Sequence, residues 1–256
     1  MVSCKPLFSI ITPTLNGGKY IKKAIESVLN QNFSSYEHLI IDSNSRDKTK
    51  LIIKDFPSVT HIVEKDESSH HAINKGIRLS KGNIICFLNS DDWLEPGILK
   101  KIRDIFLKDK NKNMIYNCRY NLFSNNKYLH TYKGLQNLSE EFMFGAPGFN
   151  SFFFDRSVFQ KGLLNTNFNF SADREFLLRS TLSFEFKQLE FVAYNYRCHD
   201  GSRTLSGNNS NKISLEHIRI YKNIKTKFKK NLSTTWFLVE IIRLIKKKNK
   251  KNKFLF

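Results

Sequence analysis

The chain has 256 residues and 40% of them are hydrophobic, so it can bury a core, which excludes wholesale disorder, a collagen-like chain and a disulfide mini-protein. Its 42 Lys and Arg against 23 Asp and Glu give a net charge of +19. Such an excess favours anionic partners: phosphate groups, nucleic acid or an acidic membrane surface.

The N-terminal part of the chain alternates strand and helix patterns. Apolar runs of β-forming residues predict strands at residues 7–12, 38–42, 59–64 and 83–88. Helical spacing of apolar residues predicts helices at residues 21–29, 48–55, 72–79 and 98–106. This alternation predicts βαβ units and an α/β fold with a mainly parallel sheet flanked by helices.

The pattern beyond residue 110 is less regular. We expect a strand pair within 114–133, and strands at 152–154 and 187–198. Candidate helices cover residues 171–182, 211–229 and 234–248. The four cysteines have no zinc-site spacing, which favours reduced, buried thiols in a cytoplasmic protein. We find no signal-peptide pattern and no apolar run long enough to span a membrane.

Three carboxylates follow predicted strands directly. Asp42 comes after the second strand, and Asp91 and Asp92 come after the fourth. Ligands of parallel α/β sheets bind at the carboxyl ends of strands, so these side chains should lie on the ligand-binding edge. An adjacent carboxylate pair suits a hard divalent cation held with a diphosphate, although a solvated turn is the simpler alternative. Asp42 is a candidate nucleoside anchor.

Two common nucleotide motifs are missing. Residues Asn16-Gly-Gly-Lys19 lack the P-loop spacing, and no G-x-G-x-x-G occurs, so the chain does not resemble a P-loop NTPase or a dinucleotide dehydrogenase.

Several motifs in order resemble family 2 glycosyltransferases, in particular bacterial enzymes that build surface polysaccharides such as capsule, O-antigen and colanic acid. The resemblance spans about residues 7–107 and weakens toward residue 205. It is carried by Ser9-Ile-Ile-Thr-Pro-Thr14 with Asn16, Ala24–Gln31, Ile40-Ile-Asp42 with Ser45 and Asp47, Asp66, Asn74-Lys-Gly-Ile77 and Phe87-Leu-Asn-Ser-Asp-Asp-Trp93.

The resemblance implies a GT-A fold in residues 1–215, with a nucleotide-sugar-binding half (1–110) fused to an acceptor half (111–215). It also implies Mn²⁺ or Mg²⁺, a nucleotide-sugar donor, with a UDP-sugar as first choice, and inversion at the anomeric carbon. The positions that match the family's donor-binding motifs are Thr12, Pro13, Asn16, Asp42, Asp66, Asn74 and Asp91. Asp91 and Asp92 would hold the metal, and Asp173 would be the catalytic base, with Glu175 as a nearby alternative.

His199-Asp-Gly-Ser-Arg203 resembles the loop that closes over the donor in this family. By this likeness His199 completes the metal shell, and Arg197 or Arg203 binds phosphate. Two positions depart from the family pattern: His71 replaces a common acid, and Asn89 replaces the first acid of a D-x-D triplet. The adjacent His70 and His71 should point apart on a helix. The Q-x-x-R-W motif of processive synthases is missing, which favours single-sugar addition.

The positive charge is concentrated at the C-terminus. Residues 221–256 contain twelve Lys or Arg and one acid, Glu240. We expect residues 216–256 to form a basic helical extension whose segment 234–253 lies on an anionic membrane surface, with the protein peripheral at the inner face and a lipid-linked acceptor. A helix packed on the domain and followed by a solvated tail is the alternative.

Three rival functions stay open on the sequence. The first is a basic nucleic-acid-binding protein, which would explain the tail. The acidic strand ends would repel phosphate, however, so we expect no nucleic-acid partner. The second is a nucleotidyltransferase, and the third is a non-catalytic, glycosyltransferase-like scaffold.

Overall fold

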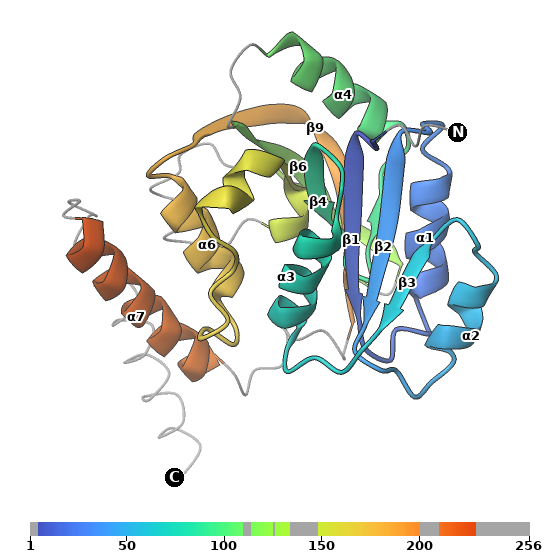
Figure 1. Cartoon of the computed structure of the whole chain (residues 1–256), viewed down its shortest axis with the longest axis horizontal. Coiled ribbons are helices and arrows are strands. Elements are labelled where there is room, and N and C mark those ends of the chain that lie inside the picture. The colour runs from blue at the N-terminus through green and yellow to red at the C-terminus, as the bar shows by residue number, and fades with distance from the viewer. Residues whose placement is uncertain (1–4, 110–113, 125, 134–147, 200–209, 229–256) are drawn as a thin grey trace.

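The computed structural model describes residues 5–109, 114–124, 126–133, 148–199 and 210–228. Within them nine strands form a single sheet with helices on both faces (Figure 1). The strands are β1 (Phe8–Thr14), β2 (Tyr36–Asp42), β3 (Thr60–Val63), β4 (Ile84–Phe87), β5 (Trp93–Leu94), β6 (Met114–Ser124), β7 (Lys127–Tyr132), β8 (Phe152–Asp155) and β9 (Glu185–Cys198). The helices are α1 (Ile21–Leu29), α2 (Thr49–Lys54), α3 (Ser69–Leu79), α4 (Ile98–Lys108), α6 (Ala172–Ser180) and α7 (Ser210–Phe228), with 3-10 helices η1 (Phe149–Ser151) and η2 (Arg156–Lys161).

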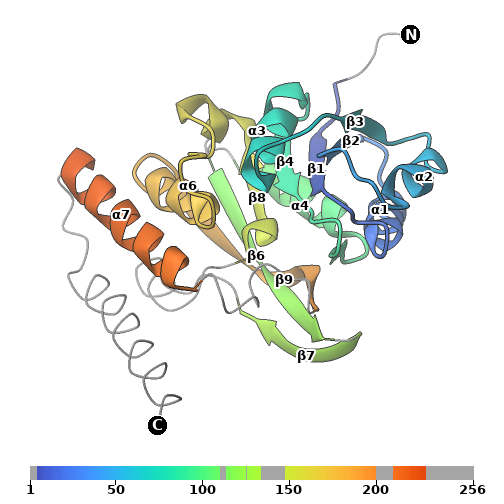
Figure 2. The ribbon, with the colours of Figure 1, turned by 90° about the horizontal axis from the view of Figure 1, so that it is seen from below.

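The sheet is parallel in its N-terminal part and mixed beyond it. Strands β3, β2, β1 and β4 are parallel neighbours in that order. β8 is antiparallel to both β4 and β6, β9 is parallel to β6, and the short β5 ends the order antiparallel to β9. β7 pairs antiparallel with β6 because two residues between them allow only a hairpin; it lies at the edge of the molecule (Figure 2). The α/β prediction is confirmed.

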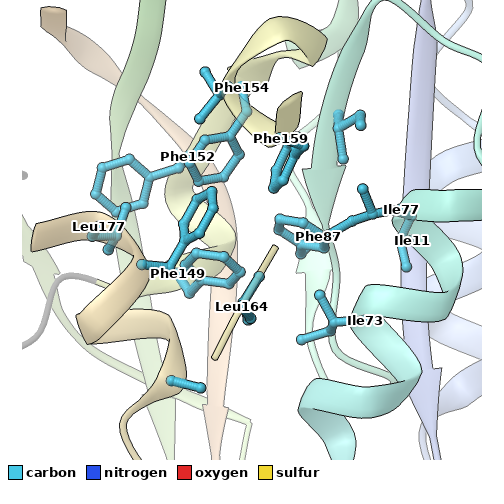
Figure 3. Packing of buried hydrophobic residues seen from close by; sticks show 14 of the residues in the cluster. Ile11, Ile73, Ile77, Phe87, Phe149, Phe152, Phe154, Phe159, Leu164 and Leu177 are labelled. Atoms are coloured by element: carbon cyan, nitrogen blue, oxygen red, sulfur yellow. The ribbon is translucent and has the colours of Figure 1, made fainter. Parts of the chain in front are cut away.

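Residue alternation along the strands sends apolar side chains to both faces. Ile11 belongs to a core with α3 and α6, whereas Ile10 belongs to a core with α1 and α4. Figure 3 shows Phe87, Phe149 and Phe154 between α3 and α6. Phe149 stacks on Phe87 at a centroid distance of 4.8 Å and meets Phe176 of α6 edge-on at 6.2 Å. The aromatic packing therefore fixes α6 against the strand that precedes Asp91 and Asp92.

Helix α3 begins three residues before its predicted start. Ser68 caps the helix by accepting from the His71 N–H group, a signal that the apolar spacing alone did not reveal. Gly76 lets α3 approach β1 closely, since a Cβ at this position would collide with the Ile11 side chain. His70 is buried and His71 is half-buried, so the two adjacent imidazoles do not share an environment.

One sheet runs through both halves that the sequence predicts on either side of residue 110. Strand β8 of the second half lies between β4 of the first half and β6. Helix α7 lies beside α6 in both views (Figures 1 and 2) and covers the predicted helix at 211–229. Its Glu216 and His217 are buried, so the expected boundary at residue 216 falls inside a packed helix. The predicted helix at 234–248 lies outside the described residues. Among those described, no helix is long and apolar enough to cross a membrane.

His38 predicts a pH dependence of stability. Its ring bonds Thr12 Oγ1 at 2.9 Å, and complete burial lowers its pKa from 6.5 to about 3. Below pH 6.5 the His38 imidazole is protonated in the unfolded chain but stays neutral in the folded chain. The free energy of unfolding therefore falls by about 1.4 kcal/mol for each unit by which the pH is lowered. Between pH 7.5 and 5, we expect urea unfolding to show His38→Gln losing about 2 kcal/mol less than wild type. Equal losses in the two proteins would contradict the buried neutral imidazole.

Candidate active site

Three loops meet at the carboxyl edge of the parallel strands. The backbone N–H of Asn16 donates to Ser45 Oγ at 2.8 Å, and that of Arg46 donates to Asn16 Oδ1 at 2.9 Å. A Cβ added at Gly17 would lie 2.9 Å from Ser90 Oγ, so the β1–α1 loop also touches the β4–β5 loop. The structure thus brings the loops of Asn16, Asp42 and Asp91 together, as the strand-end argument predicted.

Asp42 and Thr12 lie beneath this edge. Asp42 is completely buried; its Oδ1 accepts the Ser45 N–H at 2.7 Å, and its Oδ2 lies 3.3 Å from His61 Nε2. Thr12 is also completely buried, with its hydroxyl bonded to His38. These contacts fix the buried residues beneath the strand-end loops and the conformation of the β2–α2 loop. Half-buried Pro13 and exposed Asn16 are the more accessible of the predicted pocket residues.

Asp66 and Asn74 both have protein partners. Asp66 accepts from Lys75 Nζ at 2.8 Å and from Ser43 Oγ at 3.2 Å. Partial burial lowers the Lys75 pKa, but Asp66 and Glu64 outweigh it and raise the pKa above its usual value. The Asn74 amide donates to the Leu164 carbonyl at 2.9 Å and accepts the Leu164 N–H at 3.0 Å. Asn74 therefore ties α3 to the segment before α6 and does not present its amide to a ligand.

Asp91 and Asp92 occupy different environments. Asp92 is 1% exposed; its Oδ1 accepts the Arg197 N–H at 2.9 Å, and its Oδ2 accepts the amides of Asn150 at 3.0 Å and Asn89 at 3.1 Å. Burial, and then the charge of Asp91, raise the Asp92 pKa well above its usual value, against the effect of these hydrogen bonds. Both Asp92 oxygens are used below the surface, so Asp91 is the more accessible of the two carboxylates predicted to bind the metal.

The Asp91 side chain is accessible to solvent, whereas that of Asp92 is buried. Its side chain is 29% exposed, and Oδ2 lies 3.0 Å from Nε2 of His199, which is 21% exposed. A carboxylate oxygen and an imidazole nitrogen at one accessible point suit Mn²⁺, and the carboxylate alone suits Mg²⁺. Among the described residues, no three His, Cys, Asp or Glu groups converge as a metal site. The pair fits a metal whose other ligands come from a bound diphosphate and water.

The Arg197 side chain closes the other side of this pair. Its Nε donates to the Asp91 carbonyl at 3.0 Å, and its Cζ lies 4.8 Å from the ring centroids of both Tyr20 and Trp93. A guanidinium group held between two aromatic faces is positioned rather than free. Arg203, the other predicted phosphate ligand, lies outside the described residues.

A shallow hollow opens beside His199 and Arg197. It has a volume of about 230 Å³ and is lined by Lys19, Tyr20, Asn126, Arg197, Cys198 and His199. A second hollow of about 350 Å³ shares Lys19, Tyr20, Asn126 and Arg197 and adds Lys22, Lys23 and Glu26. Burial, and then the charge of Arg197, lower the Lys23 pKa.

Asp173 and Glu175 lie in the first turn of α6. Asp173 is half-buried, and its Oδ1 accepts the N–H of the neighbouring Arg174 at 2.8 Å. Glu175 forms two contacts with Arg179, at 2.9 and 3.2 Å, and is buried. This ion pair gives Glu175 a structural role, so Asp173 is the more available carboxylate.

His71, which departs from the family pattern, belongs to the start of α3. Its Nδ1 lies 2.9 Å from Ser68 Oγ, and its Nε2 lies 3.4 Å from Glu67. Asn89, which stands in place of the first acid of the D-x-D triplet, donates its amide to Asp92 Oδ2 at 3.1 Å. The sequence did not predict that Asn150 of η1 contacts Asp92, or that Tyr20 and Trp93 contact Arg197. No spacing along the chain links these residues to their partners.

The model for "Glycosyl transferase family 2" matches residues 9–177, which include every loop of this edge up to Asp173. The chain belongs to glycosyl transferase family 2. This family 2 chain is 36% identical to chondroitin synthase of Escherichia coli over 121 residues, covering 46% of this chain and 18% of that protein. It is 34% identical to the putative teichuronic acid biosynthesis glycosyltransferase TuaG of Bacillus subtilis over 108 residues, covering 40% and 43%. The chain therefore spans less than half of each of these relatives.

Solved structures show the fold of this family 2 member. Staphylococcus aureus TarS 1-349 in complex with UDP-GlcNAc matches with a TM-score of 0.66 at 18% identity, covering 85% of this chain and 66% of that one. The mannosyltransferase PcManGT from Pyrobaculum calidifontis, in complex with GDP-Man and Mn²⁺, matches with a TM-score of 0.64 at 13% identity, covering 93% and 69%. The GT-A fold expected from the sequence is confirmed.

Proposed function

We propose that this glycosyltransferase moves one sugar, with inversion, from a UDP-sugar to a hydroxyl group of a growing bacterial surface glycan, using Mn²⁺ or Mg²⁺. The observation that carries the proposal is the accessible pair of Asp91 and His199 at the edge where the strand-end loops meet. The named products of the relatives, chondroitin and teichuronic acid, support a polysaccharide acceptor. The UDP-GlcNAc bound by TarS supports the choice of donor.

In this proposal, the loops of Asn16, Asp42 and Asp66 frame the nucleotide. Pro13 and Asn16 present the accessible surface, while Asp42 sets the shape of the loop from below. Asp91 and His199 would hold the metal, which would neutralise the charge that develops on the departing diphosphate. Asp92 lies beneath and fixes the β4–β5 loop to η1 and β9 through its three hydrogen bonds.

Asp173 is the proposed general base. The acceptor hydroxyl attacks the anomeric carbon from the face opposite the diphosphate and must lose its proton as the new bond forms. A half-buried carboxylate at the start of α6 can take that proton. The packing of Phe176 on Phe149 holds α6 in place against β4, which gives the base a fixed relation to the donor edge. A single displacement of this kind inverts the anomeric configuration.

Nucleotide binding tests the donor site. We expect UDP with Mn²⁺ to raise the melting temperature of the full chain, and GDP, CDP and dTDP to raise it less. At a ligand concentration about 100 times Kd, binding adds about 2.7 kcal/mol of stability, which thermal unfolding resolves. The shift should fall when EDTA replaces Mn²⁺. No shift with any of the four nucleotides would contradict the donor site, and a larger shift with another nucleotide would contradict the choice of UDP.

We also propose that the basic tail holds the protein at the inner face of the plasma membrane, near a lipid-linked acceptor. The tail beyond Phe228 lies outside the described residues, and the support is its charge. At low salt, we expect the full chain to sediment with vesicles containing anionic lipid and a chain ending at residue 232 to stay in the supernatant. Neutral vesicles are the control. Equal partitioning of the two chains would refute membrane association through the tail.

A further inference from the structure

The hollows beside the Asp91–His199 pair are lined by positive charge. Lys19, Lys22 and Lys23 come from the loop before α1 and its first turn, and Arg197 comes from the end of β9. Glu26 lies 3.8 Å from Lys22 and offsets that one cation. Within the described part of the chain, neither Lys19 nor Lys23 forms an ion pair with an acid.

Aromatic rings position these cations, and an aromatic contact does not by itself neutralise a charge. Lys23 Nζ lies 3.3 Å from the centroid of the Trp93 ring, and Lys19 Nζ lies 5.0 Å from that of Tyr20. The Arg197 guanidinium group lies between the same two rings. Cation–π contacts orient a charge but leave it able to attract an anion. The start of α1 adds the partial positive charge of a helix N-terminus.

The cationic hollow adjoins the proposed transfer site and shares the β1–α1 loop with Asn16, but it lies away from the loops of Asp42 and Asp66. The ring of His199 lies 4.9 Å from that of Tyr20, while its Nε2 contacts Asp91. Asn126, which bonds Arg197, belongs to the β6–β7 turn in the acceptor half. The loops of Asp42 and Asp66 follow β2 and β3, at the opposite end of the strand order from β6, β9 and β5. A group bound in the hollow therefore flanks the donor on its acceptor-half side.

We propose that Lys19 and Lys23, with Arg197 behind them, bind an oxyanion carried by the acceptor glycan, so that the substrate is an anionic polysaccharide. The inference rests on the proposed transferase function and names its acceptor class. Phosphodiester and carboxylate groups share the chemistry that these cations recognise, and lysine ammonium groups bind either one. A neutral glycan would gain nothing from three cations held beside the site.

Binding of defined polymers to the full chain tests the proposal. The probes are chondroitin, which carries carboxylates, poly(ribitol phosphate), which carries phosphodiesters, and dextran, which is neutral, each with UDP and Mn²⁺ present. We expect at least one anionic polymer to bind and dextran not to bind. The polymer that binds identifies the oxyanion. Equal binding of dextran, or binding of neither anionic polymer, would overturn the proposal.

A charge-matched pair of variants separates this hollow from general attraction, including that of the basic tail. Lys19→Gln with Lys23→Gln should weaken polymer binding by about tenfold, because both charge-assisted contacts to the oxyanion are lost. Lys54→Gln with Lys100→Gln removes the same charge from exposed positions on α2 and α4 and should leave binding near wild type. Equal weakening in the two double variants would overturn the site.

The UDP–Mn²⁺ melting shift distinguishes this inference from the proposed function. It should be unchanged in both double variants. If Lys19→Gln with Lys23→Gln abolished the shift, the lysines would serve the donor and the acceptor assignment would be wrong. If wild type itself showed no shift, the proposed function would fail independently of the polymer result.

Discussion

Replacing Asp173 by Asn is expected to lower the rate of sugar transfer by about 10²- to 10⁴-fold. The amide keeps the size of the carboxylate but cannot accept the proton of the acceptor hydroxyl. Donor binding should persist, because Asp173 lies on α6, whereas the nucleotide loops follow β1, β2 and β3 and the Asp91 loop follows β4. The measurement is steady-state transfer alongside the UDP–Mn²⁺ melting shift, so that loss of chemistry is separated from loss of binding.

The matched control for Asp173 is its neighbour Glu175. Its carboxylate forms an ion pair with Arg179 at 2.9 Å, so Glu175→Gln should cost roughly 1 kcal/mol of stability and leave transfer per folded molecule near wild type. If Glu175→Gln lost transfer while Asp173→Asn retained it, the assignment of the base would be reversed.

Asp91→Ala and Asp92→Ala are expected to have different effects, the first on metal-dependent nucleotide binding and the second on the stability of the fold. Asp91→Ala removes an accessible oxygen ligand, so it should abolish the metal-dependent part of the UDP melting shift with little change in the stability of the free protein. Asp92→Ala leaves the Arg197 N–H and the amides of Asn89 and Asn150 without their acceptor. Each unpaired buried donor costs about 1–3 kcal/mol, so stability should fall by roughly 3 kcal/mol or more.

Thermal unfolding with and without UDP and Mn²⁺ measures both effects in one experiment. A loss of about 3 kcal/mol corresponds to a drop of about 6 °C for a chain of this size. The two residues would exchange roles if Asp92→Ala kept the melting temperature of the free protein and lost only the metal-dependent shift. Asp91→Asn is a further control, since it preserves the side-chain size but weakens metal binding.

The sequence was sufficient for the alternating part of the fold. Apolar runs of β-branched residues such as the one around Ile10 and Ile11 favour strands, and alternation along the strand packs them on both faces. Parallel strands then bring their carboxyl ends to one edge, so the common location of Asp42 and Asp91 followed from chain order alone. The ordered motifs of the family also predicted the GT-A fold, because local sequence carries them without knowledge of distant contacts.

The sequence by itself thus determined the α/β architecture, the family and the edge that carries the chemistry. Only the tertiary structure decided the roles of adjacent carboxylates at that edge. Asp91 and Asp92 are equivalent in sequence, but successive side chains point in different directions, and Asn150 and Arg197, both distant along the chain, close around Asp92 alone. Likewise, Glu175 forms an ion pair with Arg179, which leaves Asp173 as the available carboxylate. Lys23, Trp93 and Arg197 come into contact because the sheet brings β5 and β9 to the start of α1. Such contacts depend on three-dimensional packing between segments whose spacing in the sequence carries no signal.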